Sequence, residues 1–386
     1  MAGPLSGIKV VDLSRILAGP WSTQVLADYG ADVIKIERPE IGDDTRHWGP
    51  PFAKDSDGQE TKESAYFLAA NRGKKSISLD ISSESDREKL YKLIADADIV
   101  VENYKVGGLA KYKLDYQSVQ QVKPDIIYCS ITGFGQTGPY ANHAGYDAMI
   151  QAMGGLMSIT GEPDGNPGAG PQKVGVAVAD LMTGMYAVSG ILAALYHRIQ
   201  TGEGQHIDLA LLDTQVAWLA NQGTNFLIGH QIPTRLGTAH PSIVPYQAIP
   251  VKDGHILLAV GNDNQFKKCC QIIGLPELAS GDKFSTNQAR VANREELITL
   301  LTAQFIKKDA DHWLKHLSAV QVPCGPINTI DKVFDDEQVQ HRQMSFELEH
   351  PSLGKVAQIA NPVKFSKTPI EYEHAPPTLG QHNKEL

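Results

Sequence analysis

The first third of the chain alternates short β-branched runs with helical patterns, and this alternation most constrains how the chain can fold. The apolar and β-branched runs predict strands at 8–14, 32–39, 76–81, 98–104 and 125–135, and helical spacing predicts helices at 20–31 and 83–98. Strand, helix and strand in this order form a parallel sheet with helices on both faces. The sequence therefore predicts an α/β fold with a Rossmann-like large domain.

The turns that follow these strands are the expected ligand site, because ligands of open parallel sheets bind at the carboxyl ends of the strands. These turns hold Arg15–Gly19, Glu37–Arg46, Glu102–Gly108 and Thr132–Gly138. Neither a GxGxxG motif nor a GxxxxGK motif followed by Ser or Thr occupies them. Dinucleotide-binding and P-loop functions therefore lose their main support.

Changes of pattern divide the rest of the chain into domains. The large domain is expected to cover residues 1–213 and to be rejoined by 331–386, where HPSLGKVAQIANPVKFS predicts strands. Residues 214–234 have the pattern of a helical connector. A smaller α+β domain is predicted for 235–330, from a strand in GHILLAVG and a helix in NREELITLLTAQF.

Composition restricts the partners and the compartment. The 35 basic and 44 acidic residues give a formal net charge of −9, which argues against nucleic acid or an anionic membrane surface as the main partner. No apolar run is expected to span a membrane, and no signal-peptide pattern opens the chain. The four cysteines have neither disulfide-framework nor zinc spacing, so we expect reduced thiols, no metal site and a cytoplasmic protein.

The apolar stretch 174–198 holds a single charged residue before its terminal His-Arg, and that residue is Asp180. An unpaired buried carboxylate is costly, so Asp180 needs a reason to be there. One reason is to cap a helix, and the other is to act as a nucleophile that the N–H groups of the helix start keep ionised. The two roles are compatible. Gly184 and Gly190 lower helix propensity, which indicates close packing against another backbone.

Motifs along nearly the whole chain resemble the class III CoA-transferases, the family of formyl-CoA transferase and carnitine CoA-transferase. They are, in order, LSGIKVVDLSRILAGPWSTQVLADYGADVIKIERPEIGDDTR, NRGKKSISLD, VVENYKVGGLAKYKLDY, SITGFGQTGPY, GYDAMIQAMGG, VAVADLMTGMYA and PCGPINTIDKVFDDEQV. Their combination in one order carries the resemblance, since any one of them alone is a weak signal.

The resemblance implies a covalent mechanism. Asp180 matches the nucleophilic aspartate of the family, which attacks the thioester of an acyl-CoA to give an anhydride and then an aspartyl-CoA thioester. No metal or redox cofactor is implied, and coenzyme A enters as the acyl-CoA substrate. By position in the motifs, the implied CoA contacts are Leu17, Ala18, Arg38, Leu79, Asp80, Asn103, Tyr104, Lys111 and Tyr146.

Three of these contacts have plain structural alternatives. Arg38, expected to pair with a CoA phosphate, is also placed for a surface ion pair with Glu40. Lys111 is either a second phosphate partner or a solvated charge. Tyr146 is either close to the thioester or a core tyrosine.

Departures from the family pattern bear on the acceptor acid. The chain lacks the tetraglycine loop of the formyl-CoA:oxalate enzymes and has Ala144 where they carry a basic residue, so oxalate is not expected. The stretches GDDTRHWGPPF and RLGTAHPSIVPYQA are similar to members that pass CoA from succinyl-CoA to dicarboxylates such as glutarate. Arg46 and His240 are then predicted to hold the distal carboxylate. Their alternatives are an ordinary helix-side charge and a turn residue before Pro241.

Two other functions stay open on the sequence alone. The α-methylacyl-CoA racemases pair the aspartate with a histidine in a GHD-like motif, where this chain has Tyr146, a poor base near neutral pH. A non-catalytic acyl-CoA-binding protein is the second, and a retained Asp180 argues against it. The family further implies an interlocked homodimer, in which segments near 214–234 and 320–345 cross between the subunits.

Overall fold

The computed structural model describes residues 3–385, which fold into two compact units. The first unit consists of Met1–Met157, Lys173–Gln231 and Glu337–Leu386, and the second of Ser158–Gln172 and Ile232–Asp336. Most of the predicted connector therefore belongs to the first unit. The Gly- and Pro-rich segment that precedes Asp180 belongs to the second.

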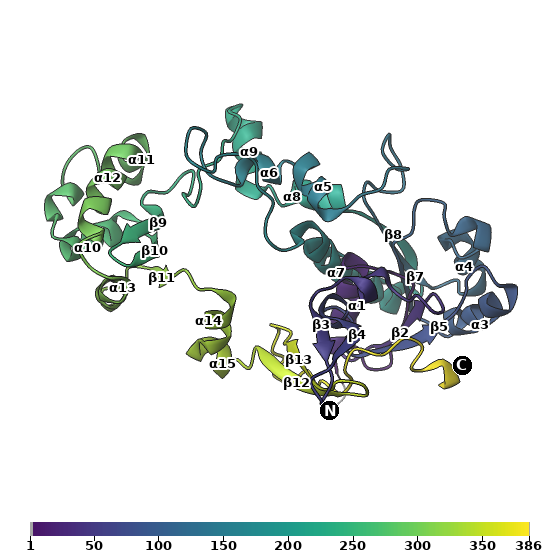
Figure 1. Ribbon diagram of the computed structural model, residues 1–386. Helices are drawn as coiled ribbons and strands as arrows, with labels where there is room; N and C mark the ends of the chain where they lie inside the picture. Colours follow the sequence, from purple (N-terminus) through teal and green to yellow (C-terminus); the bar gives the residue numbers. More distant parts are fainter. Residues whose placement is uncertain (1–2, 386) are drawn as a thin grey trace. The chain divides into compact units, whose positions relative to one another are not determined.

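A six-stranded parallel sheet forms the centre of the first unit (Figure 1). Its strand order is β5-β2-β1-β6-β7-β8. Its strands are β1 Lys9–Asp12, β2 Asp32–Glu37, β5 Lys74–Ser78, β6 Ile99–Glu102, β7 Ile127–Thr132 and β8 Gln205–Ala210. The register places Val10 of β1 beside Val33 of β2 and Ile99 of β6. The parallel sheet is confirmed, and its edge strand β8 lies where the sequence pattern predicts no strand.

Helices cover both faces of this sheet. The helices of the first unit are α1 Ala18–Asp28, α2 Ala65–Leu68, α3 Glu84–Ala95, α4 Tyr116–Val122, α5 Asp147–Met153, α7 Val178–Thr201, α8 Leu211–Ala217, α9 Ala220–Gly229 and α15 Glu337–His341, with the 3-10 turns η1 Asp44–His47, η2 Ala110–Tyr112 and η4 Asn383–Glu385. Neighbouring residues of β1 point to opposite faces, so Val10 packs in one core with α1 and α7. Val11 packs in the other core with α3 and α4.

Two hairpins complete the first unit. The antiparallel pair β3 Phe52–Lys54 and β4 Glu60–Ser64 follows η1 and was not expected from the sequence. The pair β12 Ser345–His350 and β13 Gly354–Ile359 lies in the predicted strand-forming tail. Leu348 and Val356 of this second pair pack in one cluster with Leu68 of α2.

The second unit has its own antiparallel sheet and core, as an α+β domain requires. Its sheet order is β11-β10-β9, with β9 Tyr246–Val251, β10 Gly254–Ala259 and β11 Cys324–Pro326. Its helices are α10 Asp263–Ile273, α11 Asn287–Ala292, α12 Arg294–Phe305, α13 Ala310–Ala319 and α14 Ile330–Asp335, with η3 Pro276–Ala279, while α6 Leu156–Ile159 spans the boundary with the first unit. Arg290 is fully buried there, bound to Asp263 and to the carbonyl oxygens of Val244 and Phe284.

Helix α7 bears on the expectation that no segment spans a membrane. By length and composition it is apolar enough to cross a membrane. Its residues Ala187, Val188 and Ile191 are buried in the core that it shares with α1 and the sheet. This packing is that of a core helix.

Candidate active site

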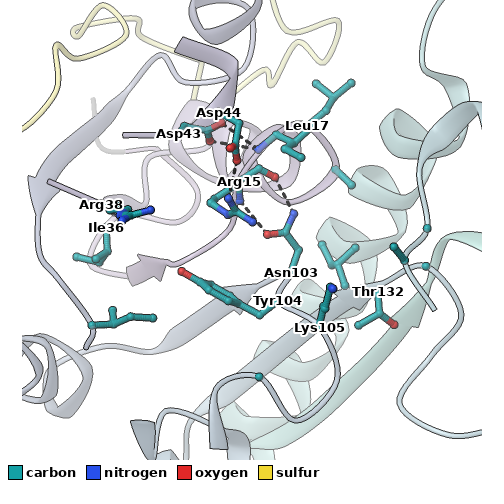
Figure 2. Close-up of a pocket in the computed structure, with 18 of the residues that line it drawn as sticks. Arg15, Leu17, Ile36, Arg38, Asp43, Asp44, Asn103, Tyr104, Lys105 and Thr132 are labelled. Carbon is teal, nitrogen blue, oxygen red and sulfur yellow. Dashed lines mark hydrogen bonds and ion pairs between the residues drawn. The ribbon is translucent and has the colours of Figure 1, made fainter. Parts of the chain in front are cut away.

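One cavity of about 750 Å³ opens at the carboxyl ends of the parallel strands, and all of its lining lies in the first unit. The lining comes from the turns after β1, β2, β5, β6 and β7, together with the segment before α5 and the first turn of α7. Figure 2 shows side chains from several of these turns converging on one space. The cavity therefore occupies the edge at which the sequence predicts a ligand site.

The structure brings the predicted nucleophile and the predicted CoA contacts into this single cavity. Ten such residues line it: Leu17, Ala18, Arg38, Leu79, Asp80, Asn103, Tyr104, Lys111, Tyr146 and Asp180. They are spread over more than 160 positions of the sequence, from 17 to 180, so only the fold brings them together. Tyr146 is 64% exposed, which excludes its alternative as a core tyrosine.

The turn after β1 is held in a strained conformation at the cavity wall. Ile16 has φ +72°, a conformation that a β-branched residue rarely adopts. Its N–H donates to both carboxylate oxygens of Asp43, at 3.1 and 3.2 Å. Asn103 fixes the preceding residue, because its amide oxygen accepts from the Arg15 N–H and its Nδ2 donates to the Arg15 carbonyl (Figure 2). The side chain of Asn103 thus shapes the cavity wall.

A buried ion pair lies beneath this turn. Lys35 and Asp43 are 2.9 Å apart, and neither side chain is exposed. Lys35 also donates to the carbonyl oxygen of Ser14. Burial opposes ionisation of Asp43, but Lys35 and the hydrogen bonds from Thr45 outweigh it and lower the pKa of this carboxyl to about 2. Asp43 therefore stays charged and keeps its hold on Ile16.

Four exposed cationic side chains line the cavity, in addition to the buried Lys35. They are Arg15, Arg38, Lys105 and Lys111. Arg15 is paired with Asp44 at 2.5 Å, whereas Arg38 makes no ion pair with Glu40 within residues 3–385. Lys105 was not predicted as a ligand residue, although its position in the turn after β6 is a sequence signal for such a role.

Asp180 lies in the first turn of α7 but does not cap it. The helix begins at Val178, with Ala177 at the N-cap position, so Asp180 is the third helical residue. This corrects the prediction that Asp180 is the capping residue. The cap comes from Asp147 of α5, whose Oδ1 accepts from the Ala179 N–H at 2.8 Å and from the Asp180 N–H at 3.4 Å. Asp147 was not predicted from the sequence.

The electrostatics of Asp180 also differ from the expectation of a carboxylate stabilised by free N–H groups. Burial, together with the negative charge of Asp147, raises the pKa of Asp180 to about 7. The carboxyl therefore titrates near neutral pH, between a neutral acid and a carboxylate that is more basic than that of an ordinary aspartate. A perturbed carboxyl in a cavity is a feature of catalytic groups.

Arg46 was predicted to bind the distal carboxylate, but its guanidinium is bound to other groups of the protein. Its Nε and Nη2 donate to the two carboxylate oxygens of Glu37, each at 2.8 Å, and Nη2 also donates to the Pro377 carbonyl. The guanidinium lies 3.6 Å from the centre of the Phe67 ring, and Arg46 is 6% exposed. Because the bidentate face is already used, we withdraw Arg46 as a ligand of the distal carboxylate.

His240 lies in the second unit, in the segment before β9. Its Nδ1 accepts from the Ser242 N–H at 3.0 Å, which is the turn-stabilising role offered as its alternative. With Nδ1 as the acceptor, the proton of the neutral ring is on Nε2. Among residues 3–385, no group of three or more His, Cys, Asp or Glu side chains is placed to hold a metal ion.

The model of CoA-transferase family III matches residues 5–383, nearly the whole chain. The chain belongs to this family. As a class III CoA-transferase, it is an enzyme that acts on acyl-CoA, and the racemase and pure binding functions give way to group transfer.

Relatives of this CoA-transferase are similar over the full length. The succinate–glutarate CoA-transferase of Agrobacterium fabrum is 51% identical over 383 residues, covering 99% of this chain and 94% of that protein. The succinyl-CoA:glutarate CoA-transferase of Homo sapiens is 46% identical, covering 99% of this chain and 85% of that protein. A crystal structure of a CAIB/BAIF family protein from Brucella suis superposes with a TM-score of 0.87 at 50% identity, covering 100% of this chain and 98% of that one.

Proposed function

We propose that this CoA-transferase moves CoA from succinyl-CoA to glutarate or a closely similar dicarboxylate, with Asp180 as the nucleophile. The names of the relatives at 51% and 46% identity support the substrates. The observation that carries the catalytic role is the position of Asp180, in the first turn of α7 and in one cavity with the nine residues implied as CoA contacts.

The reaction proceeds through Asp180 in balanced steps. The carboxylate attacks the thioester carbonyl of succinyl-CoA, the C–S bond breaks, and CoA leaves as a thiolate from a mixed aspartyl-succinyl anhydride. The thiolate attacks the aspartyl carbonyl and releases succinate, which leaves an aspartyl-CoA thioester. Glutarate attacks this thioester to give a second anhydride, and the thiolate then attacks the glutaryl carbonyl. Glutaryl-CoA and free Asp180 are the products, and no net proton is consumed.

The cavity walls carry cationic groups that suit the phosphates at the nucleotide end of CoA. Arg38, Lys105 and Lys111 present exposed cationic groups in a chain of net charge −9, so they create a local attraction for phosphate against the overall field. Leu17, Ala18 and Leu79 are buried apolar surface in the same lining. This combination suits a ligand that is anionic in one part and apolar in another.

For the distal carboxylate we retain His240 as the proposed ligand. With Nδ1 held by the Ser242 N–H, the ring presents Nε2 as a donor. The substitution His240→Ala is expected to raise the KM for glutarate and to leave the KM for a monocarboxylate such as butyrate unchanged. Equal effects on both acids would exclude this role.

We also propose that the enzyme is a homodimer of the interlocked kind implied by the family. The supporting observation is α9, all of whose residues remain at least partly exposed, with Leu227 73% and Ile228 76% exposed. Such an apolar surface is typical of an interface. Light scattering on a sizing column should give twice the chain mass, and a monomer would contradict the proposal.

The test of the transfer activity is mass spectrometry of the CoA esters formed from succinyl-CoA and a panel of acids. Glutarate, malate, itaconate, oxalate and carnitine are offered in parallel, with Asp180→Asn alongside. We expect glutaryl-CoA from the wild-type protein and none from the variant. Transfer that persists in Asp180→Asn would exclude Asp180 as the nucleophile, and a different ester would replace glutarate as the acceptor.

A further inference from the structure

Asp147 is the residue that joins the nucleophile to a neighbouring helix. Ala177 at the N-cap of α7 has no polar side chain to cap the helix. The carboxylate of Asp147 takes its place from another element, through the bonds from the N–H groups of Ala179 and Asp180. The backbone of the nucleophile is therefore held by a carboxylate that lies 33 positions earlier in the sequence.

A second side chain extends this connection. The other oxygen of Asp147 accepts from Gln151 Nε2 at 2.7 Å, one turn along α5. Gln151 Oε1 in turn accepts from the Val174 N–H at 2.9 Å, and Gln151 is fully buried. Two polar side chains of α5 thus hold the entry to α7 at Val174 and at its first turn. Both are fixed in orientation by their own hydrogen bonds.

The placement of Asp147 has an electrostatic consequence for Asp180. Two carboxylates near one helix start repel each other when both are ionised. Acylation removes the charge of the Asp180 carboxylate itself, because the negative charge leaves with the CoA thiolate in the first step and with succinate in the second. The repulsion between Asp147 and Asp180 therefore exists in the free enzyme and is relieved in both covalent forms. A neighbouring negative charge therefore favours the covalent forms over the free carboxylate.

Other ionisable groups near the start of α7 act less directly. Tyr66 of α2 has its pKa raised to about 12, by burial and then by the charges of Asp180, Asp147 and Asp43, so it is neutral at working pH. Of the elements packed against α7, β8 carries Asp208 and α8 carries Asp213. His143 and Tyr146 line the same cavity as Asp180, and α1 presents the uncharged Ala18 and Trp21 to Gly184. Asp147 is the charged group that acts on the pKa of Asp180 itself.

We propose that Asp147 is a positioning residue whose negative charge drives Asp180 toward its covalent, uncharged forms. The proposal rests on the nucleophilic role proposed for Asp180. In it, the hydrogen bonds of Asp147 place the attacking carboxylate, and its charge makes that carboxylate a stronger base and nucleophile.

The hydrogen bonds around Asp147 allow its charge and its geometry to be separated. Asp147→Asn alone would set an amide Nδ2 against Gln151 Nε2, two donors in contact. Adding Gln151→Glu supplies a carboxylate that accepts both from this amide and from the Val174 N–H. The double variant Asp147→Asn/Gln151→Glu therefore keeps the cap and moves the negative charge from the group that accepts the Ala179 and Asp180 N–H bonds to the neighbouring side chain, beside Val174. Asp213→Asn is the matched control, since it removes an exposed charge from the neighbouring α8.

The first readout is the pH dependence of kcat/KM for succinyl-CoA. In the wild-type protein and in Asp213→Asn, the acid limb should lie near pH 7, because Asp180 must be ionised to attack. In the double variant it should move down by roughly half a unit to one unit. The second readout is intact mass after acid quench, where the fraction of protein carrying covalent CoA should fall severalfold.

The outcomes separate this inference from the proposed function. If the Asp180→Asn variant still transfers CoA, Asp180 is not the nucleophile and the proposed function is wrong at that point. If Asp180→Asn is inactive but the folded double variant keeps both the acid limb and the covalent fraction of the wild type, the charge role of Asp147 is wrong. Should the double variant melt early, Asp147→Asn is measured instead. Failure of both variants to fold would make Asp147 a structural cap and would also overturn the proposal.

Discussion

Gly184 of α7 packs directly against the carbonyl group of Ala18 in α1. A Cβ atom at Gly184 would lie 2.7 Å from that carbonyl oxygen and 3.1 Å from the Trp21 ring. Gly184 comes one helical turn after Asp180, and Ala18 lines the cavity. The contact between the two helix backbones therefore sets the distance between the nucleophile and the turn after β1.

The substitution Gly184→Ala should destabilise the protein although alanine is the better helix former. The clash is with a backbone oxygen, which cannot rotate away, so we expect a loss of about 2 kcal/mol in unfolding free energy and a lower kcat. Gly190 of the same helix is the matched control, because its nearest neighbours are the Ile207 side chain at 3.6 and 3.8 Å. Gly190→Ala should gain up to about 1 kcal/mol. Denaturant melts of both variants check this, and equal effects would contradict it.

The two glycines also show what the sequence could and could not predict. The pattern predicts close backbone packing at both positions, which is confirmed for Gly184 and wrong for Gly190. A glycine in a helix signals a need for space without saying whether the neighbour is backbone or side chain. The parallel sheet was predictable because its strands and helices alternate locally. The edge strand β8 was not, because it lies outside that alternating region and Gln205, His206 and Asp208 interrupt its apolar run.

Residue types at the strand ends predicted the cavity lining, but hydrogen-bond partners that the folded chain brings together decided individual roles. Arg46 forms an ion pair with Glu37, nine residues earlier, through a turn whose shape the sequence does not reveal. The cap on Asp180 comes from Asp147, although Ala at position 177 was a local sign that the helix needed an external cap. The periodicity of apolar residues predicts helices and strands, but it does not predict which charged side chains the turns between them bring together.

The buried pair of Lys35 and Asp43 should support both stability and substrate binding. Asp43→Asn leaves the Lys35 charge buried without its partner, which costs about 3 kcal/mol. It also replaces one of the two carboxylate oxygens that accept from the Ile16 N–H by an amide donor, so the KM for acyl-CoA should rise. Asp44→Asn is the control, because its pair with Arg15 is exposed and is worth less than about 1 kcal/mol. Chemical denaturation with KM values for both variants tests this, and a stable Asp43→Asn would contradict it.

Arg38 and Arg46 should separate into a binding residue and a structural one. Arg38→Ala removes an exposed cation of the cavity, so we expect the KM for succinyl-CoA to rise about tenfold with an unchanged melting temperature. Arg46→Ala leaves the buried Glu37 without its ion-pair partner and should cost about 3 to 5 kcal/mol of stability.

A truncated thioester identifies the group that Arg38 binds. With succinyl-pantetheine, which lacks the nucleotide and its phosphates, Arg38→Ala and the wild-type protein should react at equal rates. An equal loss on both substrates would mean that Arg38 acts on the acyl end or on the fold.

The wild-type protein should become less stable as pH rises, because two of its buried carboxyls, Asp180 and Glu102, have a pKa raised to about 7. Burial raises both, with Asp147 adding to the effect at Asp180. Each folded-state pKa lies above that of the unfolded chain, so the stability that these groups contribute is fully present below about pH 4. It is lost as pH rises through about 7. Asp180→Asn and Glu102→Gln remove this loss.

We therefore expect both variants to be more stable than the wild type at pH 8, by roughly 2 kcal/mol, and to show a smaller difference at pH 5. The activities should differ, because Asp180 lines the cavity and Glu102 does not belong to its lining. Asp180→Asn should lose transfer and Glu102→Gln should retain it. Thermal melts from pH 5 to 8 measure the first effect. A stability difference that stays constant with pH would show that these two carboxyls ionise in the folded protein as they do in the unfolded chain.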